Sequence, residues 1–221
     1  MNILEIGCGD GGNLLPFTEL GCNTTGVDLS AGRIKDAILF FEERRIKGNF
    51  IASDIFKLKG LEHKFDLIIC HDVIEHIKDK ATFLSNLPKY INPEGIIFMS
   101  FPAWQMPFGG HQQICKSKII SHFPFIHLLP APIYKGILKF GGESTGCIEE
   151  LLSIKETKTS IELFEKLVHE KHITIIDRQL FFINPHYEIK FRLKPRRLYA
   201  IIAGIPHLRN FFTTSCFYTL K

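Results

Sequence analysis

Short, continuously apolar runs alternate along the chain with longer segments whose apolar residues recur at helical spacing. The apolar runs predict five strands, at residues 2–6, 24–28, 49–52, 65–70 and 95–101. The segments between them predict helices, the clearest at residues 12–20, 31–47 and 79–90. Strands that are apolar on both faces and separated by helices are typical of a parallel sheet covered on both sides. The pattern therefore predicts an α/β, doubly wound fold.

The regular pattern ends after residue 101. Residues 102–146 combine Pro, Gly, His and aromatic residues with one weakly helical piece near 115–122, and we interpret them as a lid or substrate-binding insertion. The remaining chain predicts helices over 148–154 and 160–169, a strand over 172–183, a second irregular insertion over 184–213 and a last strand over 215–220. The 221 residues suffice for one full core, so we expect a single domain spanning residues 1–221.

The stretch Leu4–Gly12 carries the first functional signal. An apolar strand runs into a glycine cluster, and Asp28 ends the next predicted strand. This layout is typical of a nucleotide-type cofactor site at the first turn of a doubly wound sheet. Glycines at positions 7 and 9 allow a sharp turn and a close approach of backbone to ligand. The Asp28 carboxylate is placed to accept hydrogen bonds from ribose hydroxyls.

The glycines alone leave two cofactor classes open. Gly7, Gly9 and Gly12 satisfy the dinucleotide pattern G-x-G-x-x-G, so a nicotinamide-dependent oxidoreductase is one alternative. Glu5, two positions before the first glycine, favours instead a cofactor with a cationic amino-acid tail. No convincing Tyr-Lys or His pair for hydride transfer accompanies the loop.

At this point the chain resembles the class I S-adenosylmethionine-dependent methyltransferases, whose first motif is (Asp/Glu)-x-Gly-x-Gly-x-Gly. Glu5, Gly7, Gly9 and Gly11 match it position by position. The resemblance continues at Ser53–Ile55 and at Phe65–Ile77. The second of these segments is similar to the fourth strand and following loop of the ubiquinone-biosynthesis O-methyltransferases. The motifs together span roughly the first half of the chain.

The resemblance implies a Rossmann-like sheet, mostly parallel, with an antiparallel last strand and the strand order 3-2-1-4-5-7-6. It implies S-adenosylmethionine as the cofactor, with an acid after the third strand against the adenine. The residues expected to contact the cofactor are Glu5, Gly7, Cys8, Gly9, Asp28, Leu29, Asp54, Ile55 and His71.

Methyl transfer to a hydroxyl requires a base, and two histidines are candidates. His111 follows two glycines just past the fifth strand, where the resembling enzymes build their acceptor site. Glycines there favour close approach to a ligand over a position in the core, so His111 is the preferred base, with a surface-loop role as the alternative. His76, on the first turn after the fourth strand, is the second candidate; the alternative is a structural role in holding the loop.

Asp72, Glu75 and His76 have the spacing that puts three ligands on one helical turn. With His111 they resemble the Mg²⁺ or Mn²⁺ site of the small-RNA terminal 2′-O-methyltransferases, in which the first acid is Glu. Because Asp-x-x-Glu-His is prevalent in metal-free relatives, we expect no metal in the site. A metal-dependent RNA 2′-O-methyltransferase remains a minor alternative.

The net charge and the cysteine content do little to narrow the predicted function. The formal net charge is +4, which permits an anionic substrate or a membrane surface without arguing for either. The six cysteines are scattered and the sequence has neither a signal peptide nor a membrane-spanning run, so we expect a cytoplasmic protein. The apolar stretch Pro124–Phe140 predicts lid packing or a dimer face, or else peripheral contact with a membrane or a lipid-linked acceptor. The second insertion carries basic residues that form a solvated face or hold a phosphate, at Lys194, Arg196, Arg197 and Arg209.

We therefore predict an S-adenosylmethionine-dependent methyltransferase, monomeric or homodimeric, acting on a hydroxyl of a small-molecule, glycan or lipid-linked acceptor and not on DNA. Met1 lies only a few residues before the glycine loop, where most relatives carry an upstream helix. For this reason a cofactor-binding module without catalysis is a further alternative. The acceptor itself is marked by no motif.

Overall fold

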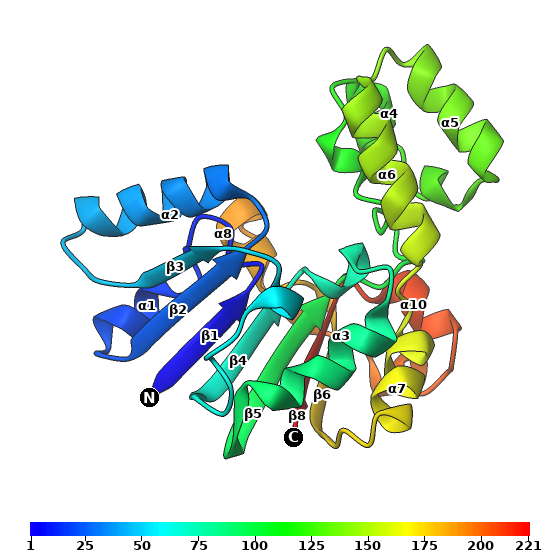
Figure 1. Ribbon diagram of the computed structural model, residues 1–221. Coiled ribbons are helices and arrows are strands. Elements are labelled where there is room, and N and C mark those ends of the chain that lie inside the picture. The colour runs from blue at the N-terminus through cyan, green and yellow to red at the C-terminus, as the bar shows by residue number, and fades with distance from the viewer.

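The computed structural model describes residues 1–221 as one twisted sheet with helices on both faces and a helical lobe beyond one end of the strands (Figure 1). The strands are β1 (Asn2–Ile6), β2 (Asn23–Asp28), β3 (Asn49–Ala52), β4 (Phe65–His71), β5 (Ile91–Phe101), β6 (Ile175–Ile183), β7 (Arg196–Arg197) and β8 (Ser215–Leu220). The helices are α1 (Leu15–Glu19), α2 (Ala31–Glu43), α3 (Lys80–Asn86), α4 (Lys118–His122), α5 (Ala131–Phe140), α6 (Thr145–Thr157), α7 (Ile161–Glu170), α8 (His186–Phe191), α9 (Ala200–Ala203) and α10 (Leu208–Phe212). None of these helices combines the length and the apolar character needed to cross a bilayer.

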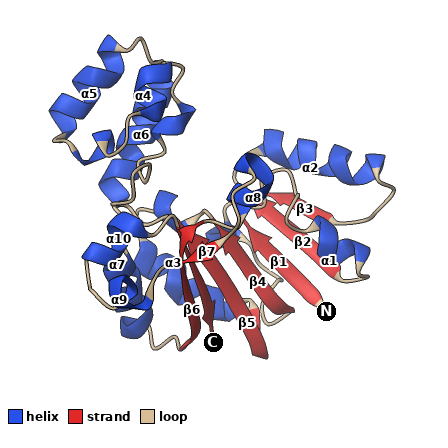
Figure 2. Cartoon of the chain, turned by 180° about the vertical axis from the view of Figure 1, so that it is seen from behind, coloured by secondary structure: helices blue, strands red, loops and turns tan.

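The sheet has the strand order β3-β2-β1-β4-β5-β8-β6-β7. Strands β1 to β5 are parallel, and β8 is antiparallel to both neighbours, β5 and β6. The predicted insertion of an antiparallel last strand between the fifth and sixth strands is confirmed. The predicted order lacks one element, the two-residue strand β7, which pairs with the outer edge of β6. Figure 2 shows this edge from behind.

Side chains from alternate positions of the strands build two cores, one on each face. Leu4 and Ile6 of β1 belong to a large cluster with Phe83 of α3 and Phe164 of α7. Ile3, which precedes Leu4 and faces the other side of the sheet, belongs to a smaller cluster that includes residues of α2. The sheet is therefore buried on both faces, as its continuously apolar strands predict.

The helical lobe comprises α4, α5, α6 and the intervening turns, residues 112–157, and has a hydrophobic cluster of its own. The buried members of this cluster are Cys115, Ile120, Ile126, Tyr134, Leu138, Ile148 and Leu151. Two chain passages join the lobe to the sheet, one after β5 and one before α7. The Trp104 backbone N–H in the first passage donates a hydrogen bond of 2.9 Å to the Thr159 carbonyl in the second.

The expectation of an irregular segment over residues 102–146 is wrong where α5 forms. This helix buries Tyr134 and Leu138, while Ile133 and Phe140 are exposed. The buried Tyr134 and Leu138 and the half-buried Ile137 lie on one face at helical spacing, a short period that the sequence analysis missed among the surrounding Pro, Gly and exposed apolar residues. The prolines at its start are compatible with a helix because the first turn does not need their missing N–H groups.

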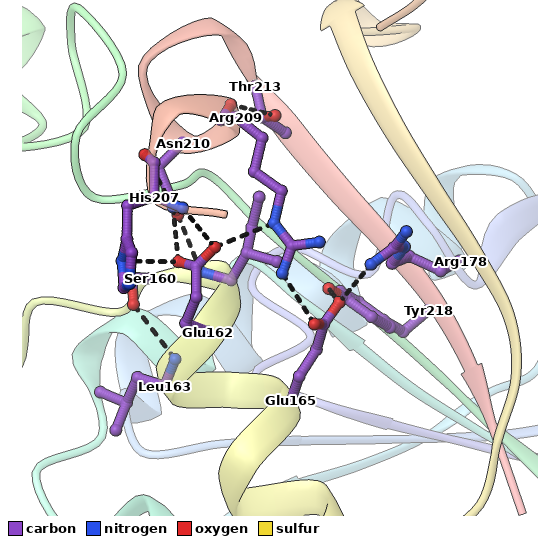
Figure 3. Close-up of polar contacts among 11 residues, drawn as sticks. Ser160, Glu162, Leu163, Glu165, Arg178, His207, Arg209, Asn210, Thr213 and Tyr218 are labelled. Carbon is purple, nitrogen blue, oxygen red and sulfur yellow. Dashed lines mark hydrogen bonds and ion pairs between the residues drawn. The ribbon is translucent and has the colours of Figure 1, made fainter. Parts of the chain in front are cut away.

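The second insertion is more ordered than the sequence predicts, and Arg209 is its anchor. Figure 3 shows the Arg209 guanidinium between two glutamates of α7, with Nε 2.9 Å from Oε1 of Glu162 and NH2 2.8 Å from Oε2 of Glu165. The Tyr218 hydroxyl of β8 donates to Glu165 at 2.9 Å. Both earlier expectations for Arg209, phosphate binding or a solvated face, are therefore wrong, because its side chain is buried in an ion-pair network.

Candidate active site

The loop after β1 depends on glycine at three positions. Gly7, Gly9 and Gly11 have φ angles of 73°, 54° and 79°, in the left-handed region that glycine adopts most readily. A Cβ on Gly7 would also lie 2.4 Å from Cγ2 of Val73. Gly12, the third glycine of the dinucleotide pattern, does not have a positive φ. The backbone therefore requires glycine at the positions of the methyltransferase motif.

Two carboxylates lie at the adjacent ends of β2 and β3. Asp28 accepts hydrogen bonds from the backbone N–H of Gly9, at 3.0 Å, and of Ser30, at 2.8 Å. Asp54 accepts from the backbone N–H of Phe56 at 3.0 Å. These bonds fix both side chains at the carboxyl edge of the sheet. Each carboxylate oxygen retains a second lone pair with which to accept from a ligand.

Two adjoining cavities open at this edge, and both include Gly7, Arg33 and Asp72 in their walls. The first, of 420 Å³, is also lined by the predicted residues Asp28, Leu29, Asp54, Ile55 and His76. The second, of 510 Å³, is also lined by Cys8, Gly9 and His71. Of the nine residues predicted to contact the cofactor, only Glu5 lines neither cavity.

Glu5 is a fully buried carboxyl group in the strand that leads into the glycine loop. Its Oε1 accepts a hydrogen bond of 2.7 Å from the Asn13 side chain, whereas Oε2 has no partner. Burial raises the pKa of Glu5 to about 7, although the bond from Asn13 works in the opposite direction. An orphaned buried carboxyl oxygen is chemically matched to a ligand group that is cationic, which is the fit that the tail of S-adenosylmethionine requires.

His71 ends β4 beside the glycine loop. Its Nδ1 lies 2.8 Å from Oγ of Ser100 and 3.2 Å from Oδ1 of Asp72. Burial alone lowers the pKa of His71, but the hydrogen bond and charge of Asp72 outweigh it, so the pKa is raised. Asp72 has a left-handed backbone, with φ of 53°, which turns the chain away from the strand.

The structure brings the two candidate bases together. The rings of His76 and His111 are 5.3 Å apart and nearly perpendicular. Nε2 of His111 lies 3.8 Å from Oε1 of the buried Glu75, and neither carboxyl oxygen of Glu75 has a hydrogen-bond partner. Burial lowers the pKa of His111 to about 4, lowers that of His76, and raises that of Glu75 well above its usual value. Only His76 of the pair lines the first cavity.

The two glycines before His111 serve protein packing. A Cβ on Gly109 would lie 2.2 Å from the Trp104 carbonyl oxygen, and a Cβ on Gly110 would lie 2.2 Å from Cβ of His127. The prediction that these glycines leave room for a ligand is therefore wrong, since the protein itself fills the space. His127 is buried, with Nε2 2.8 Å from the Trp104 carbonyl, and nothing in the sequence distinguishes it from other histidines.

The cavities are also lined by residues that the sequence did not single out, among them Arg33, Glu150, Asn184 and His186. Arg33, on the first turn of α2, contributes to both and follows the N-cap Ser30 by three positions, a spacing visible in the sequence. Glu150 reaches the first cavity from α6 of the helical lobe. Asn184 and His186 line the second cavity from the start of the second insertion, where α8 lies near the β1–β2 side of the sheet (Figure 2). Their long separation in sequence from the glycine loop hid them.

A parallel sheet with a left-handed glycine loop after β1 and acids ending β2 and β3 defines a Rossmann-like protein that binds a nucleoside-type cofactor. The chain belongs to the methyltransferase-domain family, whose sequence profile matches residues 1–124.

Individual relatives agree with this assignment. The ubiquinone biosynthesis O-methyltransferase of Rickettsia canadensis (strain McKiel) is 35% identical over 100 residues, which cover 45% of this chain and 42% of that protein. The chain thus matches less than half the length of this curated relative. An S-adenosylmethionine-dependent methyltransferase from Clostridium acetobutylicum has a TM-score of 0.59 at 15% identity, covering 100% of this chain and 83% of its own. PKMT2 from Rickettsia typhi, solved with AdoHcy, has a TM-score of 0.57 at 20% identity, with coverages of 99% and 48%. At such identities, the two structures show the shared fold.

Proposed function

We propose that the chain is an S-adenosylmethionine-dependent methyltransferase that O-methylates a small-molecule, glycan or lipid-linked acceptor. The observation that carries the proposal is the set of left-handed glycines at positions 7, 9 and 11, joined through Gly9 to Asp28. This set matches the methyltransferase motif and differs from the dinucleotide pattern, which weighs against a nicotinamide-dependent oxidoreductase. The cofactor supplies an activated methyl group on a sulfonium centre.

Distinct residues would hold the parts of the cofactor. Asp28 would accept hydrogen bonds from the ribose hydroxyls, and Asp54 one from the adenine amino group. Leu29 and Ile55 would cover the faces of the base, since both line the same cavity. Glu5 would face the cationic amino-acid tail with its unpartnered oxygen.

His111 is our proposed base, with His76 as the second candidate. As the acceptor oxygen forms its new bond to the methyl carbon, the carbon–sulfur bond breaks and the hydroxyl proton passes to an imidazole nitrogen. The products are the methyl ether, the neutral thioether and an imidazolium. The pKa of about 4 keeps the His111 imidazole unprotonated at neutral pH, and it also makes this group a weaker base than an unperturbed histidine. The name of the Rickettsia relative supports an oxygen acceptor.

We place the protein in the cytoplasm, as a monomer or homodimer, with peripheral contact with a membrane when the acceptor is lipid-linked. The features that support this contact lie on α5, where Ile133 and Phe140 are exposed beside Lys135 and Lys139. Exposed apolar side chains interspersed with lysines suit the interface of an anionic bilayer.

Isothermal titration calorimetry with S-adenosylmethionine, S-adenosylhomocysteine and NAD tests the donor half of the proposal. We expect both sulfur ligands to bind and NAD not to bind. Turnover is then assayed on a panel of phenolic, glycan and polyprenyl-linked hydroxyls, with release of S-adenosylhomocysteine as the readout. Binding of NAD alone would contradict the proposed function. Binding of the sulfur ligands without turnover on any hydroxyl would favour a non-catalytic cofactor-binding module.

A further inference from the structure

We propose that Cys115, Glu143 and Cys147 form a binding site for one Zn²⁺ ion inside the helical lobe. The two cysteines belong to no C-x-x-C pair, so the sequence carries no metal-binding spacing at these positions. None of the three residues lines either cavity of the candidate active site. The site therefore lies apart from the proposed methyl transfer and does not depend on it.

The three side chains converge from two separate parts of the lobe. Cys115 lies just before α4, Glu143 lies in the turn between α5 and α6, and Cys147 lies on the first turn of α6. One donor atom from each residue lies within 4.8 Å of the other two. Around one Zn²⁺, with bonds of about 2.3 Å to sulfur and about 2.1 Å to oxygen, the donors lie about 3.5–3.8 Å apart. Side-chain shifts of about 1 Å therefore bring all three donors onto one ion.

Glu143 is a buried carboxylate that the lobe holds in one orientation. Its Oε2 accepts a hydrogen bond from the backbone N–H of Lys116 at 3.0 Å, and its Oε1 accepts one from Ser117 at 2.9 Å. Burial alone would raise the pKa of Glu143, but these hydrogen bonds outweigh it and the pKa is lowered. Each oxygen retains a second lone pair for a metal ion. The lobe thus presents a fixed negative charge beside two thiols.

Tyr134 of α5 provides the independent observation that a partner is missing from this group. Its side chain is fully buried, and its hydroxyl has no hydrogen-bond partner. Burial raises the pKa of this hydroxyl, and Cys115 and Cys147 raise it further because they lie near it. A buried hydroxyl without a partner is costly. Once a cation converts the neighbouring thiols to thiolates, the Tyr134 hydroxyl can donate a charge-assisted hydrogen bond to one of them.

The donor set selects the kind of cation. Two sulfurs and one carboxylate oxygen suit Zn²⁺, whereas Mg²⁺ and Ca²⁺ prefer oxygen donors alone. Without an ion, burial and the charge of Glu143 raise the pKa of Cys115 to about 12, so this thiol stays protonated. Binding of Zn²⁺ would release the thiol protons to solvent, and the ion would offset most of the negative charge that remains. Cys147 is half-buried, which leaves a path for the ion to enter and room for water as the fourth ligand.

The bound ion would act as a structural clamp on the lobe. It would join the chain before α4 to the start of α6, two helices of the lobe (Figure 1). The hydrophobic cluster of the lobe has 7 buried residues, a small core for a segment that stands apart from the sheet. Small cores gain most from a metal cross-link. We therefore expect Zn²⁺ to stabilise the folded lobe.

Cobalt titration of the full chain under reducing conditions tests the site without relying on activity. Co²⁺ bound by thiolates gives an intense ultraviolet charge-transfer band. We expect a band that saturates at one equivalent, is displaced by Zn²⁺ and is unaffected by Mg²⁺. Cys115→Ala and Cys147→Ser should each weaken binding at least about 100-fold, and Tyr134→Phe about tenfold. As a second readout, free Zn²⁺ at about 100 times its Kd should raise the Tm of the wild-type chain by about 5–10 °C.

Cys22→Ser is the matched control, because Cys22 is also half-buried but precedes β2 in the sheet. It should leave the cobalt band and the Tm shift unchanged, whereas Cys147→Ser should lose both. Circular dichroism checks that each variant folds. No band in the reduced chain, or a band that survives Cys147→Ser, overturns the inference. Oxidation of Cys115 and Cys147 to a disulfide in the presence of Zn²⁺ would also overturn it, since a bound ion should protect both thiolates.

Discussion

The backbone N–H of Gly9 donates a hydrogen bond of 3.0 Å to Oδ2 of Asp28, which ties the glycine loop to the end of β2. The other carboxylate oxygen of Asp28 accepts from Ser30, the N-cap of α2. One side chain thus positions both the loop and the start of the next helix. A ribose that binds Asp28 would meet an acceptor that is already held in place.

We predict that Asp28→Asn weakens S-adenosylmethionine binding at least about tenfold. The amide NH₂ cannot accept a hydrogen bond, and a bond to a charged group contributes about 1.5–3 kcal/mol. Calorimetry measures the change. Asp177→Asn is the matched control, because the Asp177 carboxylate on β6 accepts from the Gln179 side chain and lines neither cavity, and it should change the affinity less than about threefold. Equal losses in the two variants would contradict a specific role for Asp28.

Gly7→Ala should destabilise the fold by roughly 2–4 kcal/mol and abolish cofactor binding. The new Cβ would lie 2.4 Å from Val73, and alanine disfavours the left-handed backbone. Urea denaturation gives the free energy of unfolding. Gly12→Ala, with its nearest contact at 3.4 Å, should cost little, and Val73→Ala added to Gly7→Ala should restore part of the loss. Wild-type stability of Gly7→Ala would show that the loop rearranges.

Glu5→Gln should stabilise the ligand-free protein at pH 8 by up to about 3 kcal/mol, with a small effect at pH 5. Burial raises the pKa of Glu5 from 4.5 to about 7 in the folded state. The folded protein therefore holds this proton more tightly than the unfolded chain, and stability falls as pH rises from 4.5 through 7. Urea denaturation at the two pH values measures the difference. A stability gain at pH 5 equal to that at pH 8 would rule out this titration.

Although Glu5→Gln should stabilise the ligand-free protein, it should weaken cofactor binding. The wild-type protein should bind S-adenosylmethionine more tightly as pH rises through about 7, because ionised Glu5 attracts the cationic tail. Glu5→Gln should bind more weakly and lose this pH dependence. His71 also titrates nearby, so His71→Gln serves as the control and should retain the rise. Calorimetry across pH 6 to 8.5 separates the two groups.

Arg209→Met should cost about 3–5 kcal/mol of stability, because it removes the buried cation shared by Glu162 and Glu165 and leaves Glu165 with only the more exposed Arg178 (Figure 3). Adding Glu165→Gln should recover part of the loss. Lys166→Met is the control, since Lys166 and Glu170 form an exposed pair at 3.8 Å that contributes less than about 0.5 kcal/mol. Urea denaturation compares the variants. Similar small losses for Arg209→Met and Lys166→Met would mean that the network is not stabilising.

Hydrophobic periodicity and helix caps in the sequence predicted several strands and helices correctly. The sequence-derived bounds of β1, β3 and β8 coincide with the structure, and the placement of β8 between β5 and β6 follows from the family resemblance. The predicted helix at 31–47 begins after Ser30, whose hydroxyl caps it, but ends at Glu43. These features need only periodicity, a cap and a known strand order.

Contacts between residues that are far apart in the chain could not be predicted from the sequence. From the sequence, Gly110 was expected to leave space for a ligand beside His111. In the structure the side chain of His127 fills that space. Arg209 indicated a surface cation, whereas its partners lie 47 and 44 residues earlier in the chain. Likewise, the approach of His111 to Glu75 depends on how the helical lobe is attached to β5. Such pairings are set by tertiary packing, which no window of sequence contains.

The attachment of the helical lobe has a consequence for how this chain can change. The lobe has a core of its own and joins the sheet at a short seam, where Trp104 meets Thr159. Elements with independent cores open and tolerate substitution as units. Under the proposed function the sheet holds the methyl donor, so we expect that replacement of the lobe would change the acceptor while donor binding stays the same.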